Sequence, residues 1–429
     1  MDLVLRGGRV LGADSSGAWS DVAADVRIRD GRIVEIAGGL RGGRELAVTD
    51  LWVVPGLCEL RAHLREPGAE HKEDLTSGAR AAAAGGYTTV CALPDTAPVN
   101  DQRTITELIV RRAAEVGLAR IRPIGAITRG LDGERLADLA DMKDGGIVAV
   151  ADGERCLHNP GLLRRALEYA RTFDLPLIQH AEDVQLAEGG VIHESALSTR
   201  IGLKAQSELA ECAIVARDLE IVAVTGARYH VAHVSSARTV ELVRDAKRRG
   251  LPVTAEVTAH HLALTEQACA HYDPHTRLTP PLRSERDRQA LVAGVADGTI
   301  DAIATDHAPQ GLTDQEGLFE EAVAGAVGLE TSLGLVLALV RDGALPLRRA
   351  LDALTAAPAR AFALGVGTLE VGGAADLAII DPVRTWTVGP DELVGKGKNT
   401  PLVGRSLIGR AVLTLLAGQP TCDRDRRFA

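Results

Sequence analysis

Aromatic side chains are scarce in this 429-residue sequence, where Phe, Trp and Tyr together make up 3% of the residues. A surface that binds nucleic acid by stacking on its bases needs such rings. The formal net charge of -10 also leaves no basic stripe that could neutralise phosphates. Both features argue against nucleic acid as a partner.

Long apolar runs and targeting signals are missing as well. No apolar stretch reaches the roughly 18 residues that a membrane-spanning helix needs. Residues 1–6 (MDLVLR) lack the apolar core of a secretory signal. The six cysteines form no CxxC motif or other close-spaced pair, which is typical of reduced thiols in a cytosolic protein. We therefore expect a cytoplasmic protein that does not bind a membrane.

The composition that is present is that of an ordinary globular protein, 46% hydrophobic and 25% charged. Both ends of the chain have β patterns. Two alternating strands within residues 26–36 flank Asp30-Gly31, a strong hairpin signal. Apolar strands return near the C-terminus. We predict one small β-sandwich domain that is built from residues 1–52 and residues 366–429.

Eight short apolar runs occupy the middle of the chain and alternate with helical patterns. The runs span residues 52–60, 87–93, 121–127, 146–151, 176–179, 228–232, 252–257 and 300–304. Such runs of Val, Ile, Leu and Ala are typical of buried parallel strands joined by crossover helices. Eight units close naturally into a (β/α)₈ TIM barrel, which we predict over residues 53–365. Periodicity alone leaves a doubly wound open sheet as the alternative.

Barrel enzymes carry their sites at the C-terminal ends of the strands. Imidazoles and carboxylates follow seven of the eight apolar runs, and only the third run ends without one. These residues are His63, Asp95, Asp152, His180, His233, the pair His260 and His261, and Asp306. Each has an ordinary structural interpretation, such as a hydrogen-bonded histidine, a turn aspartate or a helix N-cap. Their coincidence at successive strand ends instead favours a site for a divalent cation such as Zn²⁺.

This arrangement suggests a reaction. A metal ion held by Asp152, His180 and His233 would keep one position open for water and lower the pKa of that water. Asp306 would shuttle the proton between this hydroxide and a leaving nitrogen. The site would then hydrolyse, or close, a cyclic amide.

The first apolar run ends in four alternating polar residues, Glu59, Arg61, His63 and Arg65. Strand side chains alternate, so these four share one face. Polar groups cannot face a packed core without partners, which predicts that they face the barrel mouth. A salt-bridge cluster that caps the barrel is the alternative.

The same residues belong to motifs that resemble the bacterial dihydroorotases of the amidohydrolase superfamily. The motifs, which are long and follow the family's order along nearly the whole chain, are HLREPG (63–68), AGGYTTV (84–90), VTAEVTAHH (253–261), PPLR (280–283) and ATDHAP (304–309). The resemblance implies a (β/α)₈ barrel with a β-sandwich and one or two zinc ions. It also implies reversible conversion of N-carbamoyl-aspartate to dihydroorotate in pyrimidine biosynthesis.

The resemblance also assigns roles to single residues. His63, Asp152, His180, His233 and Asp306 would be metal ligands, with Asp306 as the catalytic residue. Asp152 stands where related hydantoinases and allantoinases carry a carbamylated lysine, which disfavours those two activities.

Four residues depart from the family pattern. Arg61 replaces the first histidine ligand, and a guanidinium has no lone pair for a cation. We therefore expect one zinc ion rather than two. On the substrate side, where Arg65 is kept as the partner of a carboxylate, Asp95 and Thr279 each replace an asparagine and Gln310 replaces a histidine. Asp95 would repel a substrate carboxylate.

Three interpretations follow. The first, which we adopt, is an enzyme with a single zinc ion in which Arg61 substitutes for the missing cation by pairing with Asp152 or Asp306. The second is a non-catalytic chain that serves as a structural partner of aspartate carbamoyltransferase. The third is a shifted substrate, another cyclic amide with a neutral or cationic group near Asp95. The resemblance also suggests a homo-oligomer and association with aspartate carbamoyltransferase.

Overall fold

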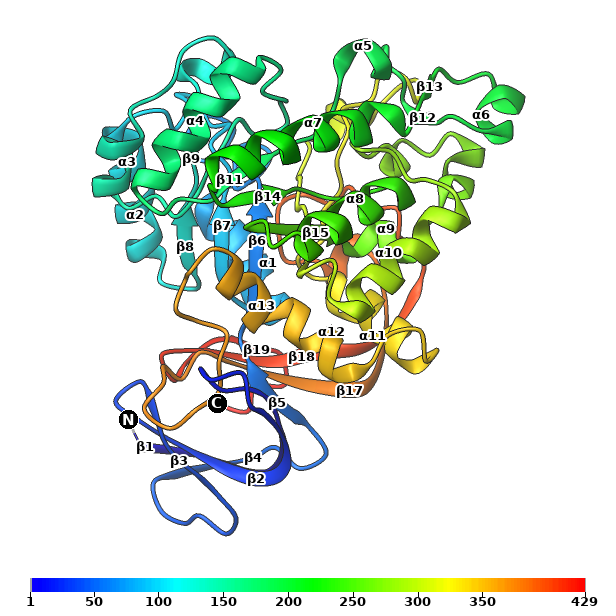
Figure 1. The fold of residues 1–429 in the computed structure, drawn as a ribbon. Helices are drawn as coiled ribbons and strands as arrows, with labels where there is room; N and C mark the ends of the chain where they lie inside the picture. Colours follow the sequence, from blue (N-terminus) through cyan, green and yellow to red (C-terminus); the bar gives the residue numbers. More distant parts are fainter. Residues whose placement is uncertain (1, 429) are drawn as a thin grey trace.

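The computed structural model describes residues 2–428, which form a β domain and a barrel (Figure 1). The β domain is one eight-stranded sheet from both ends of the chain, with strand order β19-β18-β17-β5-β1-β2-β3 and β4 paired to β1. Its strands are β1 (Asp2–Ala13), β2 (Trp19–Arg29), β3 (Arg32–Ala37), β4 (Arg44–Ala47), β5 (Trp52–Pro55), β17 (Leu377–Thr387), β18 (Ser406–Leu416) and β19 (Gln419–Asp423). β5 lies between the N-terminal and the C-terminal strands and joins them.

The sheet divides along β1, which pairs in parallel with β4 through Leu3–Arg6 and with β5 through Arg9–Val10. The register of β1 against β2 shifts between Leu5 and Gly8, and Gly7 takes a positive φ of 74° at this bulge. The inward side chains of the two parts enclose an apolar core that includes Val26, Ile379 and Leu413. The predicted β2–β3 hairpin is confirmed, with positive φ at both Asp30 and Gly31 as a tight primed turn requires.

Eight parallel strand positions form the barrel. They are β6 (Leu57–Ala62), β7 (Tyr87–Ala92), β8 (Arg120–Pro123) continued by β9 (Gly125–Ala126), β10 (Val150–Ala151), β11 (Leu177–Gln179), β14 (Tyr229–Val231), β15 (Val253–Thr258) and β16 (Ala302–Ala304). The third strand is split at Ile124, so that β8 pairs with β7 and β9 pairs with β10. A bridge between Ala62 and His307 closes the ring. The predicted barrel with a β-sandwich is confirmed, and the doubly wound alternative is wrong because the sheet closes.

Helices cover the outside of the barrel (Figure 1). The longer ones are α1 (Leu75–Gly85), α2 (Arg103–Val116), α3 (Leu139–Gly145), α4 (Pro160–Thr172), α7 (Leu209–Thr225), α8 (Ala237–Arg248), α10 (Glu285–Asp297), α11 (Ser332–Arg341) and α12 (Leu347–Leu354). Short elements lie in the connections: α5 (Val184–Ala187), β12 (Ile192–His193), α6 (Ala196–Ile201), β13 (Ala205–Gln206), α9 (Ala259–Ala263) and α13 (Ala356–Ala361). Local capping fixes their ends; Asp74 begins α1 by accepting from the Ser77 amide, and Gly86 ends it in the left-handed conformation.

The two domains share one stretch of chain. Trp52–Pro55 belongs to the terminal sheet, and Leu57–Ala62 belongs to the barrel. Gly56 joins them at a point where an added Cβ would lie 2.0 Å from the Thr88 side chain, so only glycine fits. The boundary predicted between residues 52 and 53 falls inside β5, because an apolar run does not reveal where a strand changes sheets.

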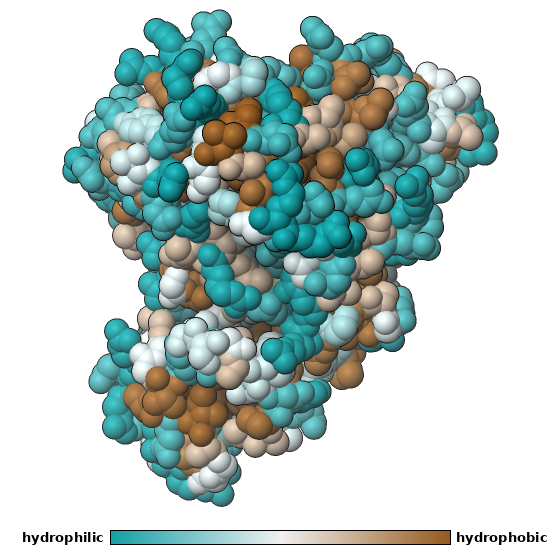
Figure 2. All heavy atoms as spheres, viewed as in Figure 1, coloured by the Kyte–Doolittle hydropathy of each residue, from teal (hydrophilic) through white to brown (hydrophobic). Residues whose placement is uncertain are grey.

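The visible surface is mostly hydrophilic (Figure 2), and the cysteines are free. Figure 2 shows hydrophilic residues over most of the visible barrel face, with the more extended apolar group on the β domain. All six cysteines are free thiols, as predicted. Among residues 2–428, no helix is long and apolar enough to cross a membrane.

Candidate functional site

Arg61 lies at the end of β6, with only 1% of its side chain exposed. Its Nε donates to Asp306 Oδ1 at 2.8 Å, and one terminal nitrogen donates to the Gly153 carbonyl at 3.2 Å. The other terminal nitrogen, Nη1, is buried without a hydrogen-bond partner. Below it, Glu59 accepts from the backbone amides of Arg61 and Thr305, which ties β6 to the end of β16. The guanidinium is therefore held rigidly against Asp306, one of the two partners suggested by the sequence.

His63 bridges two carboxylates. Its Nδ1 lies 2.8 Å from Asp95 Oδ2, and its Nε2 lies 3.1 Å from Glu154 Oε1. Carboxylates only accept hydrogen bonds when ionised, so both ring nitrogens carry hydrogen and the ring is an imidazolium. Burial opposes this charge, but Asp95 and the hydrogen bonds outweigh burial and raise the pKa of His63 to about 9.

Arg65 continues the same chain of charges. It adopts a positive φ of 59°, and its Nη1 lies 3.2 Å from the Asp95 carboxylate. Burial raises the pKa of Asp95, but the charges of His63 and Arg65 lower it overall. Three carboxylates and three cations thus lie across the barrel mouth. We call Asp306, Arg61, Glu154, His63, Asp95 and Arg65 the ionic network.

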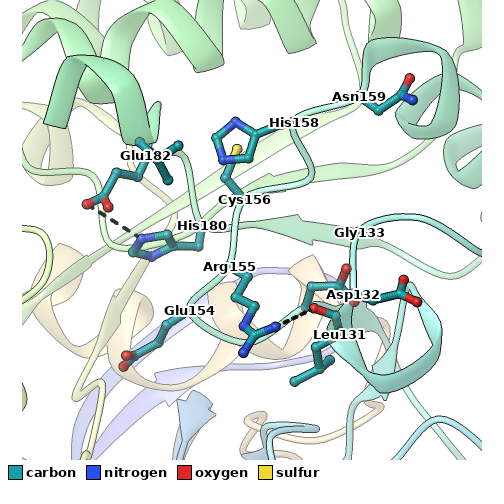
Figure 3. Close-up of a pocket in the computed structure, with 12 residues that line it drawn as sticks. Leu131, Asp132, Gly133, Glu154, Arg155, Cys156, His158, Asn159, His180 and Glu182 are labelled. Atoms are coloured by element: carbon teal, nitrogen blue, oxygen red, sulfur yellow. Dashed lines mark hydrogen bonds and ion pairs between the residues drawn. The ribbon is translucent and has the colours of Figure 1, made fainter. Parts of the chain in front are cut away.

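The other side of the mouth contains four histidines, of which only His180 has a carboxylate near it, Glu182 at 3.8 Å (Figure 3). His180 Nδ1 lies 2.8 Å from His233 Nε2. Burial, followed by the positive charge of Arg61, holds the pKa of His233 well below its usual range. Burial also lowers the pKa of both His260 and His261 to about 4. We call these four residues the histidine group; at neutral pH, His233, His260 and His261 are uncharged.

Asp152 is hydrogen-bonded to the residues that follow the third barrel strand. Its Oδ1 accepts from the amides of Ile127 and Thr128 at 2.9 Å each, and its Oδ2 accepts from the Thr128 hydroxyl at 2.6 Å. Burial raises the pKa of this carboxyl. The sequence placed no functional residue at the end of the third strand, and Thr128 is the one that it missed.

Whether these side chains can bind a metal ion depends on the lone pairs of their donor atoms. At the first position Arg61 offers no lone pair, and both nitrogens of His63 face carboxylates. At the second position, Asp152 has three of its lone-pair sites occupied, and the 2.8 Å between His180 and His233 is a hydrogen-bond distance. Within residues 2–428, no three His, Cys, Asp or Glu side chains converge as metal ligands would. As placed, the residues do not fit a metal ion.

A cavity of about 410 Å³ opens beside the site, at the ends of β10 and β11 (Figure 3). Asp152, Glu154, His180 and Glu182 contribute to its lining. A much smaller pocket is lined by Thr279, Asp306 and two members of the histidine group, and Glu154 lines this pocket too. The Glu154 side chain, 36% exposed, therefore separates the open cavity from Asp306.

The predicted substrate residues lie in three places. Arg65 and Asp95 pair with each other in the ionic network, and Thr279 lines the small pocket. Gln310 is buried; its amide donates to the Ala324 carbonyl and its oxygen accepts from Lys72. Sequence reasoning missed Lys72 and Glu154. Glu154 follows Asp152 by two residues, so reading the whole strand-end loop would have found it.

Comparison with known proteins gives consistent results. A family model described as Dihydro-orotase-like matches residues 51–239. The dihydroorotase of Anaeromyxobacter sp. (strain K) is 50% identical over 422 residues, covering 97% of each chain. That of Syntrophotalea carbinolica is 45% identical over 423 residues, 98% of this chain and 99% of the other. L-hydantoinase (dihydropyrimidinase) from Arthrobacter aurescens shares the fold, with a TM-score of 0.88 at 24% identity over 99% of this chain and 96% of that chain.

Proposed function

We propose, from the premise that this chain belongs to the dihydroorotase family of the amidohydrolase superfamily, that it interconverts N-carbamoyl-aspartate and dihydroorotate in pyrimidine biosynthesis. The observation that carries the proposal is the 50% identity with a dihydroorotase over 97% of both chains. The strand-end carboxylate Asp306, which lines a pocket of about 10 Å³ that shares Glu154 with the cavity of about 410 Å³, supports it.

Ring opening can be written with the chain's own groups. Water adds to the amide carbonyl carbon, the carbon–nitrogen bond breaks, and the leaving nitrogen gains a proton. Asp306 takes the proton from the water and delivers it to the nitrogen. Burial raises the pKa of Asp306 despite the nearby charge of Arg61, which makes it a better base than an exposed aspartate. Closure is the reverse of these steps.

The cations of the ionic network would bind the substrate's charges. Arg65 pairs with Asp95 at 3.2 Å, so a substrate carboxylate has to compete with Asp95 for it. Arg61, fixed against Asp306, places a positive charge next to the oxygen on which negative charge develops. Nη1 of Arg61 is buried without a hydrogen-bond partner, so a ligand oxygen would have to enter beside it to accept its hydrogen bond.

The dihydroorotase family is typically zinc-dependent. A zinc ion would act as a Lewis acid and lower the pKa of its water. One zinc ion on Asp152, His180 and His233 stays a prediction. Occupancy requires the contact between His180 and His233 to open and Asp152 to turn from Thr128. Metal content of protein purified without chelators tests this prediction; a background level would contradict it.

The deciding experiment is turnover of dihydroorotate and N-carbamoyl-aspartate, with and without added zinc. We expect the wild type to be active and Asp306→Asn to lose at least about 100-fold of kcat, because that change removes the proton carrier. Asp391→Asn, at an exposed site, is the matched control. An inactive wild type would reject the proposal and favour the non-catalytic alternative, a structural partner of aspartate carbamoyltransferase. Turnover of neutral hydantoins alone would favour a shifted substrate.

The assembly and location are also proposed. We infer a cytoplasmic homo-oligomer that acts on a small molecule and associates with aspartate carbamoyltransferase. Light scattering of the chain alone, then with that partner, measures both associations. A monomer that shows no mass increase with the partner contradicts them.

A further inference from the structure

Arg61 is a charged side chain in a buried position, and burying a charge ordinarily lowers the stability of a protein. It is 1% exposed, and an unpaired buried charge is expensive. Asp306 at 2.8 Å and the Gly153 carbonyl at 3.2 Å satisfy part of the guanidinium, while Nη1 stays unpartnered. The structure therefore keeps a cation at this point and holds it by two different strand ends.

The charges around Arg61 balance. The ionic network contains three carboxylates, from Asp306, Glu154 and Asp95. It also contains three cations, from Arg61, His63 and Arg65. No carboxylate in the network is left without a positive neighbour. A divalent cation added here would meet the positive guanidinium and no free lone pair on His63.

We propose that the Arg61 guanidinium takes the place of a divalent cation in this barrel mouth. It neutralises Asp306, offers Nη1 as a donor to an oxygen of the ligand, and excludes a metal ion from the position between β6 and β16. Arg61 thereby supplies, through hydrogen bonds, the positive charge that a metal ion would supply by coordination.

The proposal makes metal uptake at the position between β6 and β16 depend on the charge of residue 61. Replacing Arg61 by histidine removes the positive charge and supplies an imidazole lone pair next to Asp306. Arg61→Lys keeps the positive charge in a smaller group and is the matched control. Both variants keep His180, His233 and Asp152, so any zinc bound by those residues is common to all three proteins.

The experiment is zinc content by elemental analysis. Each protein is incubated with excess ZnCl₂ and desalted, and thermal unfolding is recorded with and without zinc. We expect Arg61→His to bind one more equivalent of zinc per chain than the wild type, and its Tm to rise by several degrees with zinc. We expect Arg61→Lys to match the wild type in zinc content. Circular dichroism shows whether Arg61→His folds.

Three results would overturn the proposal. One is equal zinc content in the wild type and Arg61→His. Another is an Arg61→Lys variant that also gains an equivalent, which would show that positive charge does not exclude the metal. The third is an Arg61→His protein that stays unfolded at every zinc concentration. Since uptake is measured without substrate, the outcome is independent of whether the wild type shows turnover.

Discussion

The two sides of the barrel mouth use the same residue type in opposite charge states. In the ionic network, His63 lies within 3.1 Å of two carboxylates, and its pKa rises to about 9. In the histidine group, His260 and His261 are equally buried but have no carboxylate at hydrogen-bond distance, and their pKa falls to about 4. Burial penalises the imidazolium in both places; the partners decide which form persists.

This difference shows how one side of a site can have all of its charges paired while the other side carries uncharged imidazoles. Charged groups that are already paired attract charged ligands less, because the ligand has to displace the partner. In the histidine group, His261 and the pair His180–His233 use their ring nitrogens in hydrogen bonds, and Nε2 of His260 has no partner. His63, as an imidazolium, has no lone pair. Any cation that the mouth binds should therefore approach the histidine group, and an anion should compete for the cations of the ionic network.

The largest expected effect comes from removing one partner of the buried pair. Asp306→Ala leaves the Arg61 guanidinium uncompensated and should lower the free energy of unfolding by about 3–5 kcal/mol. Urea denaturation measures the loss. Asp391→Ala, at an exposed site, should change it by less than about 0.5 kcal/mol. A loss below 1 kcal/mol for Asp306→Ala would show that the network does not depend on this pair.

His63→Gln tests the charge of His63 in the ionic network through the pH dependence of stability. The folded-state pKa of His63, about 9, lies above its ordinary value of 6.5. Its stabilising contribution is therefore complete below pH 6.5 and is lost as the pH rises through 9. We expect a stability difference from the wild type of about 2 kcal/mol at pH 6 that shrinks toward pH 10. Chemical denaturation at several pH values measures it; a constant difference would mean that His63 is not charged.

His260→Asn tests the uncharged state of His260 in the histidine group, for which stability should change with pH in the opposite direction. Its folded-state pKa of about 4 lies below 6.5, so its contribution is present above pH 6.5 and is lost as the pH falls through 4. Between pH 7 and pH 4.5 the wild type should lose about 2 kcal/mol more than the variant. Parallel stability curves over that range would contradict an uncharged His260.

Glu154→Gln should have the smallest effect of these variants, and it tests the binding of an anionic ligand. Because the side chain is 36% exposed, its contact with His63 should contribute less than about 1 kcal/mol to stability. Removing its charge should still strengthen the binding of a small dicarboxylate such as malonate several-fold, since one competing anion is gone. Calorimetric titration measures this affinity, with Glu188→Gln as the exposed control. An unchanged affinity would show that Glu154 does not compete with anions.

Much of this arrangement could be predicted from the sequence. Apolar runs and the Asp30-Gly31 turn have local signatures, so the buried parallel strands and the hairpin could be predicted from them, whereas periodicity alone left open whether the sheet closes into a barrel. Glu59, Arg61 and His63, which the alternation of residues 59–65 predicted on one face at the barrel mouth, are all buried. Glu154 and Thr128 lie in connections, where periodicity does not set the direction of a side chain. That Asp152 bonds to Thr128 depends on how neighbouring strands align, which no local pattern encodes.

The position of β5 affects the order in which the protein can be completed during synthesis. The strand that leads into Arg61 is flanked by β1 and by β17, which lies more than 320 residues later in the chain. A ribosome delivers Leu377–Thr387 only near the end of translation. Until then β5, which leads into the strand that carries Arg61, lacks its neighbour on one side, and such long-range pairing forms slowly. A chain truncated before β17 should therefore lose the geometry of the barrel mouth, although nearly all of the barrel sequence is present.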